Sequence, residues 1–223
     1  MIEVFTSYHH DNDQYYKNGL CRWAEENGIF LDRSVKLDEI SERLSNETIR
    51  RIIRDRYLRD TTVTLLLVGK ETRFRKHIDW ELKSSMIDGA VNKRSGIVVV
   101  LLPEVDRGNV FVSDWRETEL LYPHLSGWSV LPSRTDYERM FPEVPARIID
   151  NLIKDKNLIS ITSWANIENN PAGFRFLIEN AHYSRHEKEY CLKRPMRRAN
   201  HNPTTILTGL GRIDQPRNAL SGR

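Results

Sequence analysis

The sequence predicts an α/β protein built on a doubly wound parallel sheet. Two runs, Val63–Val68 and Gly96–Leu102, show no apolar-polar alternation and are rich in β-branched and aliphatic residues, a pattern typical of strands buried on both faces. Up to the end of the second run, and with both runs counted as strands, the expected elements alternate as β-α-β-α-β-α-β. This order indicates a doubly wound fold. With 223 residues, 39% of them hydrophobic, the chain is long enough to bury a substantial core.

The N-terminal segment supplies the first strands of this pattern. We expect a strand over Glu3–Tyr8 and then a polar loop, residues 9–13, whose Asp and Asn side chains can cap the following helix. That helix ends at Gly28, which suits a left-handed cap. A short strand over Ile29–Leu31 follows. Residues 32–44 are polar, irregular and numerous enough to form a functional loop.

Helices are expected between and after the two apolar strands. One covers Thr48–Leu58, and another follows the Val63 strand and carries Glu81. Beyond residue 103 the pattern loosens, with a helix around Asp114–Leu121 and another over Pro145–Ile153. A last helix starts at about Pro171, where proline suits a first turn.

Charge and cysteine content narrow the class of protein. Residues 193–223 hold seven Lys or Arg against one Asp, a net +6 in a chain whose total is +3. This basic tail leaves nucleic-acid binding open as a minor alternative, but no aromatic residue is interleaved to stack on bases, so we do not expect it. The two cysteines, Cys21 and Cys191, lack the spacing of a disulfide framework or a metal site, which favours a reducing cytoplasm.

Membrane insertion and secretion are not expected either. The longest apolar run, Ile97–Pro103, is far shorter than the ~20 residues needed to cross a bilayer. The N-terminus opens with a strand pattern instead of a charged and apolar leader. We therefore expect a soluble, unprocessed protein of the cytoplasm.

Several common kinds of site are disfavoured by the motifs. His9, His10, Asp11 and Asp13 could suggest a metal centre, but the other five histidines do not complete a ligand set at a known spacing, so no metal is expected. The chain lacks a P-loop after its strands and a GxGxxG fingerprint after the first strand. Ser7 has no flanking glycines, so a hydrolase nucleophile turn is also disfavoured.

Glu81 is the candidate for chemistry. It lies one to two helical turns beyond the end of the Val63 strand, and ligands of parallel sheets bind beyond the carboxyl ends of the strands. It falls at the border of the helix face that Ile78, Leu82, Ser85 and Met86 share, so we expect it to be half buried. The alternative is a solvated glutamate that pairs with a neighbouring lysine, which is common on helices.

Trp80, beside Glu81, points away from the core according to the same helical phase. An outward tryptophan is either an interface residue or a platform for a ligand. The sequence does not separate these two interpretations.

Five segments together resemble the TIR-like domain of the Thoeris antiphage defence protein family ThsB. The most specific are the VGKET strand and loop, the helix start IDWEL, and DRSV after the second strand. The later motifs SWANI, PAGFRFLIENA and RPMRR are also similar to C-terminal parts of this family. The five segments are Val4–Tyr8, Leu31–Val35, Ile52–Tyr57, Leu67–Thr72 and Ile78–Leu82.

The resemblance implies a flavodoxin-like TIR fold over residues 1–155, followed by an α-rich C-terminal extension, residues 156–223, with the basic tail. It implies that NAD is the substrate, with no further cofactor, and that Glu81 is the catalytic residue. Nicotinamide departs, positive charge develops on the adjoining ribose, and a carboxylate near that sugar stabilises the transition state. The residues expected to contact substrate are Ser7, Tyr8, Asp32, Arg33, Ser34 and Trp80.

For the Thoeris branch the resemblance implies a cyclic ADP-ribose isomer that diffuses to a partner effector, ThsA. It also implies self-association through TIR surfaces, with a phage component as candidate trigger. Some members of the wider family act as adaptors without catalysis. A non-catalytic interaction module, with residues 32–35 and Trp80 as its assembly surface, is therefore the competing hypothesis.

Overall fold

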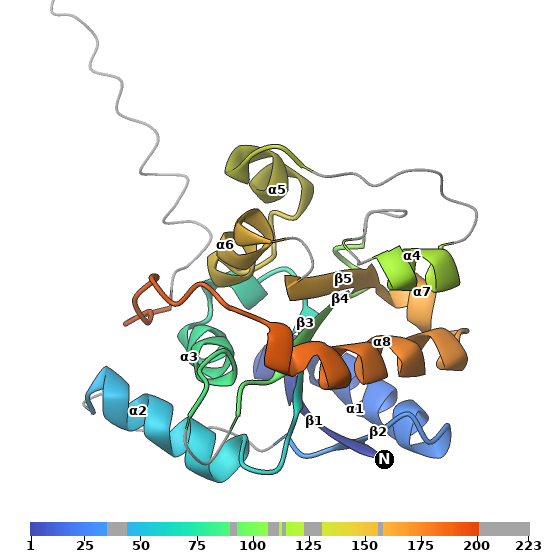
Figure 1. Cartoon of the computed structure of the whole chain (residues 1–223), viewed down its shortest axis with the longest axis horizontal. Helices are drawn as coiled ribbons and strands as arrows, with labels where there is room; N and C mark the ends of the chain where they lie inside the picture. Colours follow the sequence, from blue (N-terminus) through green and yellow to red (C-terminus); the bar gives the residue numbers. More distant parts are fainter. Residues whose placement is uncertain are drawn as a thin grey trace, which may run out of the picture.

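The computed structural model of the protein describes residues 1–34, 44–89, 93–106, 112, 115–122, 131–155 and 158–200. Its centre is a five-stranded sheet in the order β2-β1-β3-β4-β5, and every strand pair is parallel (Figure 1). The strands are β1 (Ile2–Ser7), β2 (Phe30–Asp32), β3 (Val63–Val68), β4 (Gly96–Leu101) and β5 (Ile159–Ser163). This flavodoxin-like α/β architecture confirms the predicted fold class.

Helices connect the strands and cover both faces of the sheet (Figure 1). Helices α1 and α8 pack on one face through a cluster that includes Leu20, Leu65 and Phe174. Helices α3 and α6 pack on the other face through Leu66, Leu82 and Ile148. The helices are α1 (His10–Glu26), α2 (Asn46–Ile52), α3 (Lys76–Ser85), α4 (Trp115–Leu121), α5 (Arg134–Met140), α6 (Ala146–Lys154), α7 (Trp164–Ile167) and α8 (Pro171–Ser184), with short turns at Ile53–Tyr57, Thr72–Phe74 and Arg185–Glu187.

Several elements begin and end where the sequence predicts. β3 has the predicted bounds, because a continuous apolar run fits a strand that is buried along its whole length. Helix α8 starts at Pro171, and Gly28 adopts a φ of +64° after α1, as a left-handed cap requires. The predicted Asx cap of α1 is wrong: the helix already begins at His10, so His9 occupies the cap position and its side chain makes no capping hydrogen bond.

A third apolar cluster lies outside these two layers and covers the outer side of α3. It contains Phe5, Ile49, Ile53, Trp80 and Met196, so it joins β1, the α2 region and the C-terminal segment. Helix α3 is consequently buried nearly all round. This unusual burial determines the environment of every side chain on that helix.

Residues beyond 155 complete the sheet and wrap the domain. β5 pairs with β4 along five residues, and α8 packs on the sheet. The domain boundary predicted at residue 155 therefore falls between α6 and β5, although β5 belongs to the same sheet as the four preceding strands. Residues 188–200, which we call the C-terminal strap, then run back across α6 and α3 (Figure 1). Residues 35–43 of the predicted functional loop and residues 201–223 of the basic tail lie outside the described residues.

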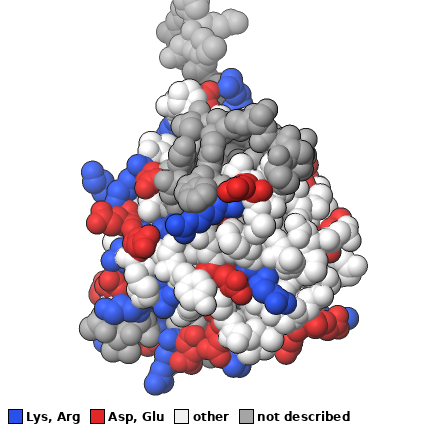
Figure 2. Space-filling view, turned by 45° about the vertical axis from the view of Figure 1, so that its right-hand side comes forward, with Lys and Arg blue, Asp and Glu red and all other residues white. Residues whose placement is uncertain are grey.

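No helix within the described ranges has the length and apolarity needed to span a membrane. On the face seen in Figure 2, acidic and basic side chains are interspersed. The described surface on that side therefore does not gather its lysines and arginines into one basic patch of the kind that a nucleic-acid backbone attracts.

Candidate active site

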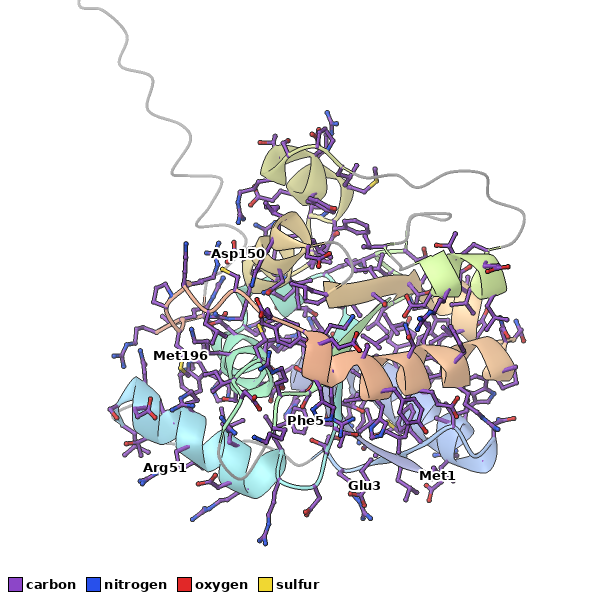
Figure 3. The ribbon with its side chains drawn as sticks, viewed as in Figure 1. Met1, Glu3, Phe5, Arg51, Asp150 and Met196 are labelled. Carbon is purple, nitrogen blue, oxygen red and sulfur yellow. The ribbon has the colours of Figure 1, made fainter. Side chains whose placement is uncertain are left out.

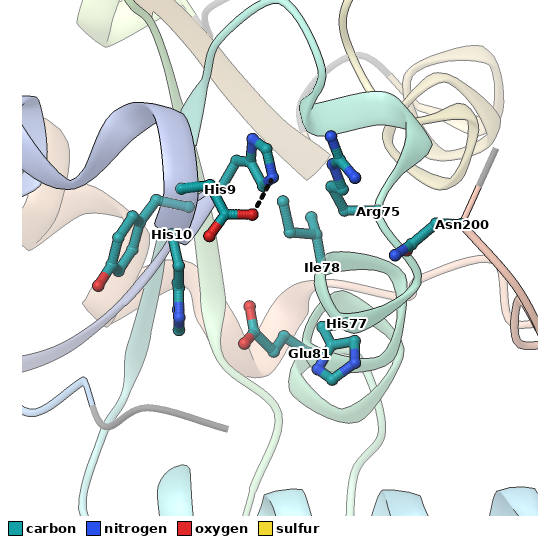
Figure 4. Close-up of a pocket in the computed structure, with 9 residues that line it drawn as sticks. His9, His10, Arg75, His77, Ile78, Glu81 and Asn200 are labelled. Atoms are coloured by element: carbon teal, nitrogen blue, oxygen red, sulfur yellow. Dashed lines mark ion pairs between the residues drawn. The ribbon is translucent and has the colours of Figure 1, made fainter. Parts of the chain in front are cut away.

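A cavity of about 190 Å³ opens where β1 ends and where α1 and α3 begin (Figure 4). β1 and β3 are adjacent, and the helices that follow them cover opposite faces, so this is the switch point at which doubly wound sheets bind ligands. The cavity is smaller than the ~300 Å³ typical of the smallest ligand pockets, so it fits one part of a large ligand. Its lining residues are Tyr8, His9, His10, Asp11, Arg75, His77, Ile78, Glu81 and Asn200.

Glu81 lies in this cavity on the second turn of α3 (Figure 4). The residue is only 3% exposed, which is deeper than the half-buried position that its helical phase predicts. Ser7, the last residue of β1, donates its hydroxyl to Glu81 Oε2 at 2.5 Å. β1 therefore ends by presenting a hydrogen-bond donor to the carboxyl group on the facing helix.

Burial raises the pKa of Glu81 to about 8, because the charged form loses water without gaining a neighbouring cation. The hydrogen bond from Ser7 lowers this pKa, but by less than burial raises it. In the protein without ligand, Glu81 is therefore mostly protonated at neutral pH. A cationic group that enters the cavity favours the carboxylate, so ionisation and binding of a cation are coupled.

The remaining walls carry hydrogen-bond donors and rings. His9 has its pKa lowered by burial and by the nearby Arg75 guanidinium, so its imidazole is neutral at physiological pH. His10 stacks on Tyr8 with ring centroids 4.5 Å apart. His77 stacks on Trp80 with centroids 4.9 Å apart. The cavity thus combines the buried carboxyl group of Glu81 and the exposed one of Asp11 with rings that can lie against a flat ligand.

Three of the seven predicted site residues come together, and four do not. Ser7 and Tyr8 meet Glu81 at the cavity. Asp32, Arg33 and Ser34 lie at the end of β2, outside the set of lining residues.

The three β2 residues have structural partners in their own neighbourhood. Asp32 accepts a hydrogen bond from Thr6 at 2.8 Å and pairs with Lys17 at 2.6 Å. Ser34 donates its hydroxyl to Asp32, and Arg33 pairs with a β1 glutamate at 2.7 Å. Their predicted contact with substrate stays a prediction, for a part of the ligand that extends beyond the cavity.

The outward position predicted for Trp80 is wrong. Its side chain is 1% exposed, and its indole Nε1 donates to the backbone carbonyl of Arg197 at 2.7 Å. The α2 region and the C-terminal strap cover the helix face that looked solvent-exposed from the sequence. Trp80 therefore has no open face for a ligand, and it borders the cavity only through His77, on which it stacks.

Seven of the nine lining residues were not predicted as site residues. His9, His10 and Asp11 were considered only for a metal centre, Ile78 only for the buried face of its helix, and Arg75, His77 and Asn200 were not singled out at all. His77 could have been found, because it precedes Glu81 by four positions and so shares its helix face. Arg75 could have been found as the residue directly before α3. No sequence signal indicates Asn200, which reaches the cavity only because the strap folds back. Within the described part of the chain, no group of three or more His, Cys, Asp or Glu could hold a metal ion.

A parallel sheet in the order β2-β1-β3-β4-β5, with a buried glutamate on the helix after β3, defines an α/β domain of the TIR-like class. Residues 5–107 match the family model of the Thoeris protein ThsB, TIR-like domain. These residues, 103 of the 223, therefore form a TIR-like domain of the kind found in the Thoeris ThsB proteins of antiphage defence. No curated protein matches the chain. The matched segment contains Ser7 and Glu81 and ends well before the strap.

Proposed function

We propose that this protein cleaves NAD at the bond between nicotinamide and ribose and cyclises the remainder to an isomer of cyclic ADP-ribose. The observation that supports this proposal is Glu81, a buried carboxyl group that receives a hydrogen bond from Ser7 and lines the cavity at the switch point of the sheet. The family match supports the same interpretation, because it covers both residues.

In the proposed reaction the bond between the ribose C1′ and the pyridinium nitrogen breaks. Its electron pair goes to that nitrogen, so nicotinamide leaves as a neutral molecule and the ribose becomes an oxocarbenium ion. A nitrogen of the adenine ring or a hydroxyl of the same molecule then forms the new bond to C1′ and releases one proton. Attack by water in its place would give ADP-ribose.

The carboxyl group of Glu81 is suited to the movement of positive charge during this reaction. The substrate carries its positive charge on nicotinamide, and the transition state moves that charge to the ribose. An ionised Glu81 at the ribose stabilises the transition state strongly, because a buried carboxylate is little screened by water. Ser7 orients the carboxyl group and lowers its pKa, so it helps to make the charged form available.

We also propose that the cyclic product carries the signal to the effector ThsA in the cytoplasm, after a phage component triggers the enzyme. Self-association belongs to the same proposal. β2 is an edge strand, and Arg33 at its end keeps 53% of its side chain exposed, which suits contact with a second copy.

One observation favours a non-catalytic interaction module as the second candidate. The residues at the end of β2 lie outside the cavity, so a function that depends on them does not need Glu81. In that case Glu81→Gln would leave defence intact, whereas Arg33→Ala or Ser34→Ala would abolish it.

Mass spectrometry of nucleotides from phage-challenged cells separates the two candidates. Cells would express the wild type, Glu81→Gln, or the matched control Glu25→Gln, which alters an exposed residue of α1. We expect a species with the mass of cyclic ADP-ribose in the wild type and the control, and its absence in Glu81→Gln. Phage protection by Glu81→Gln with no such species in any strain would refute the enzymatic proposal.

A further inference from the structure

The C-terminal strap is fixed to the domain by a buried ion pair. Arg147 on α6 is fully buried and binds both carboxylate oxygens of Asp79 on α3, at 2.8 and 3.0 Å. The same guanidinium donates to the backbone carbonyls of Arg194 and Pro195, at 3.1 and 3.0 Å. One arginine therefore holds α6, α3 and the strap together, and its charge is both paired and hydrogen-bonded.

Further contacts fix the direction in which the strap leaves this ion pair. The backbone N–H of Arg197 donates to Asp79 at 2.8 Å, and its carbonyl accepts from the Trp80 indole. Met196 packs into the apolar cluster beside α3 (Figure 3). The strap is therefore held on both sides of residue 196 and runs on toward the first turn of α3.

Asn200 is where the strap meets that first turn. Its Oδ1 accepts the backbone N–H of Lys76 at 2.9 Å, across 124 positions of sequence. The residue in the N-cap position of α3, Arg75, makes no side-chain capping bond of its own. Asn200 thus supplies the cap that the local sequence lacks.

The orientation of the Asn200 amide follows from this bond. An N–H group requires an acceptor, so Oδ1 faces the helix, and Nδ2 on the other arm of the amide faces away from it. Asn200 is exposed and lines the cavity, and Figure 4 shows it beside the start of α3. A hydrogen-bond donor from the strap is therefore presented to any ligand in the cavity.

The cavity is polarised by this arrangement. Glu81 lies at one end, where positive charge is favoured once the carboxyl ionises. Arg75, which also pairs with Glu71, lies at the other end with Asn200 and the N-terminus of α3, whose dipole favours negative charge. The exposed carboxylate of Asp11 also lines the cavity, 3.6 Å from the His9 ring. A ligand that carries a cationic ring and anionic oxygens a few bonds apart matches both ends.

We propose that Asn200 is a substrate-binding residue whose Nδ2 donates to a phosphate oxygen of the dinucleotide while its Oδ1 caps α3. This inference rests on the proposed function, since it takes NAD as the ligand. It assigns part of the active site to the strap, far outside the segment that the family model matches.

Two substitutions of Asn200 separate binding from capping. Asn200→Asp keeps an acceptor for the Lys76 N–H, but it replaces the donor by a negative charge. Asn200→Ala removes both functions. We expect Asn200→Asp to melt like the wild type and to bind NAD about tenfold or more weakly, as loss of a hydrogen bond to a charged group predicts. Asn200→Ala should both melt earlier and bind more weakly.

Binding is measured by calorimetric titration of NAD into the full chain that carries Glu81→Gln, so that the substrate is not consumed. Arg198→Ala, an exposed residue of the same strap, is the matched control and should bind NAD unchanged. Equal affinity in Asn200→Asp and its parent would overturn the inference and leave Asn200 as a cap alone. If neither the wild type nor the Glu81→Gln chain binds NAD, the proposed function itself is overturned, and the NAD contact of Asn200 with it.

Discussion

Glu81→Gln should stabilise the protein while it abolishes activity. The folded protein keeps a proton on Glu81 up to about pH 8, whereas the unfolded chain releases it near pH 4.5. The folded state thus binds more protons between these values, so its stability falls as pH rises through that window. Each unit of pKa difference corresponds to about 1.4 kcal/mol, and at pH 7 the burial of Glu81 therefore costs about 3 kcal/mol.

Glutamine has nearly the same shape, stays neutral, and can still accept the hydrogen bond from Ser7. Urea unfolding of wild type and Glu81→Gln at a series of pH values tests the argument. The variant should be more stable by about 3 kcal/mol at pH 7, and the difference should shrink toward zero near pH 4.5. The control Glu25→Gln should follow the wild type, because Glu25 is exposed. Equal stability of wild type and Glu81→Gln from pH 5 to 8 would refute the assignment of a buried, neutral carboxyl group.

Three further predictions concern the neighbourhood of this site. Ser7→Ala removes the hydrogen bond that lowers the pKa of Glu81. The acid limb of the pH profile of kcat/KM should therefore move to higher pH, and the rate near neutral pH should fall roughly tenfold. An unchanged pH profile would contradict the orienting role of Ser7. Asp79→Asn leaves the buried Arg147 without its counter-charge and should destabilise the fold by about 3 to 5 kcal/mol in urea unfolding. The combined Asp79→Leu and Arg147→Met variant should recover only part of that loss, because the strap backbone at residues 194, 195 and 197 loses its partners; full recovery would contradict the role of the ion pair in holding the strap. Burial raises the pKa of Cys21 to about 12, so its thiol should resist iodoacetamide at pH 8 until the protein unfolds, and rapid labelling of Cys21 in the folded protein would show that it is accessible.

The sheet was largely predictable because its central strands are apolar on both faces. β3 and β4 are short runs of mostly aliphatic residues in which Thr64 is the polar exception, and a strand buried along its whole length is the element that such a run favours. β5 was not predicted because Ile159–Ser163 is short and mixes isoleucine with serine and threonine, which resembles a loop. Its polar residues Thr162 and Ser163 are nevertheless buried, and only tertiary contact reveals this.

The site was predictable only as far as local periodicity extends. Glu81 was singled out by the rule that parallel sheets bind ligands at the carboxyl ends of their strands, whereas Ser7 was expected only from the family resemblance. The error at Trp80 arose because helical phase assumes one buried face, whereas α3 is also covered by the strap and the α2 region. Asn200 could not be predicted for the same reason, since a contact across 124 positions leaves no periodic trace in the sequence.

The place of β5 in the sheet also determines how this chain can be divided. The family match ends at residue 107, yet β4 pairs with β5 along Ile97–Leu101. A fragment cut at the end of the match would turn β4 into an exposed edge that is apolar on both faces, and such edges recruit further strands and precipitate. In the longer chain Val112 bridges to Ile161 on the outer side of β5. Transplanting this domain into another protein therefore requires residues far beyond 107, or the graft will aggregate.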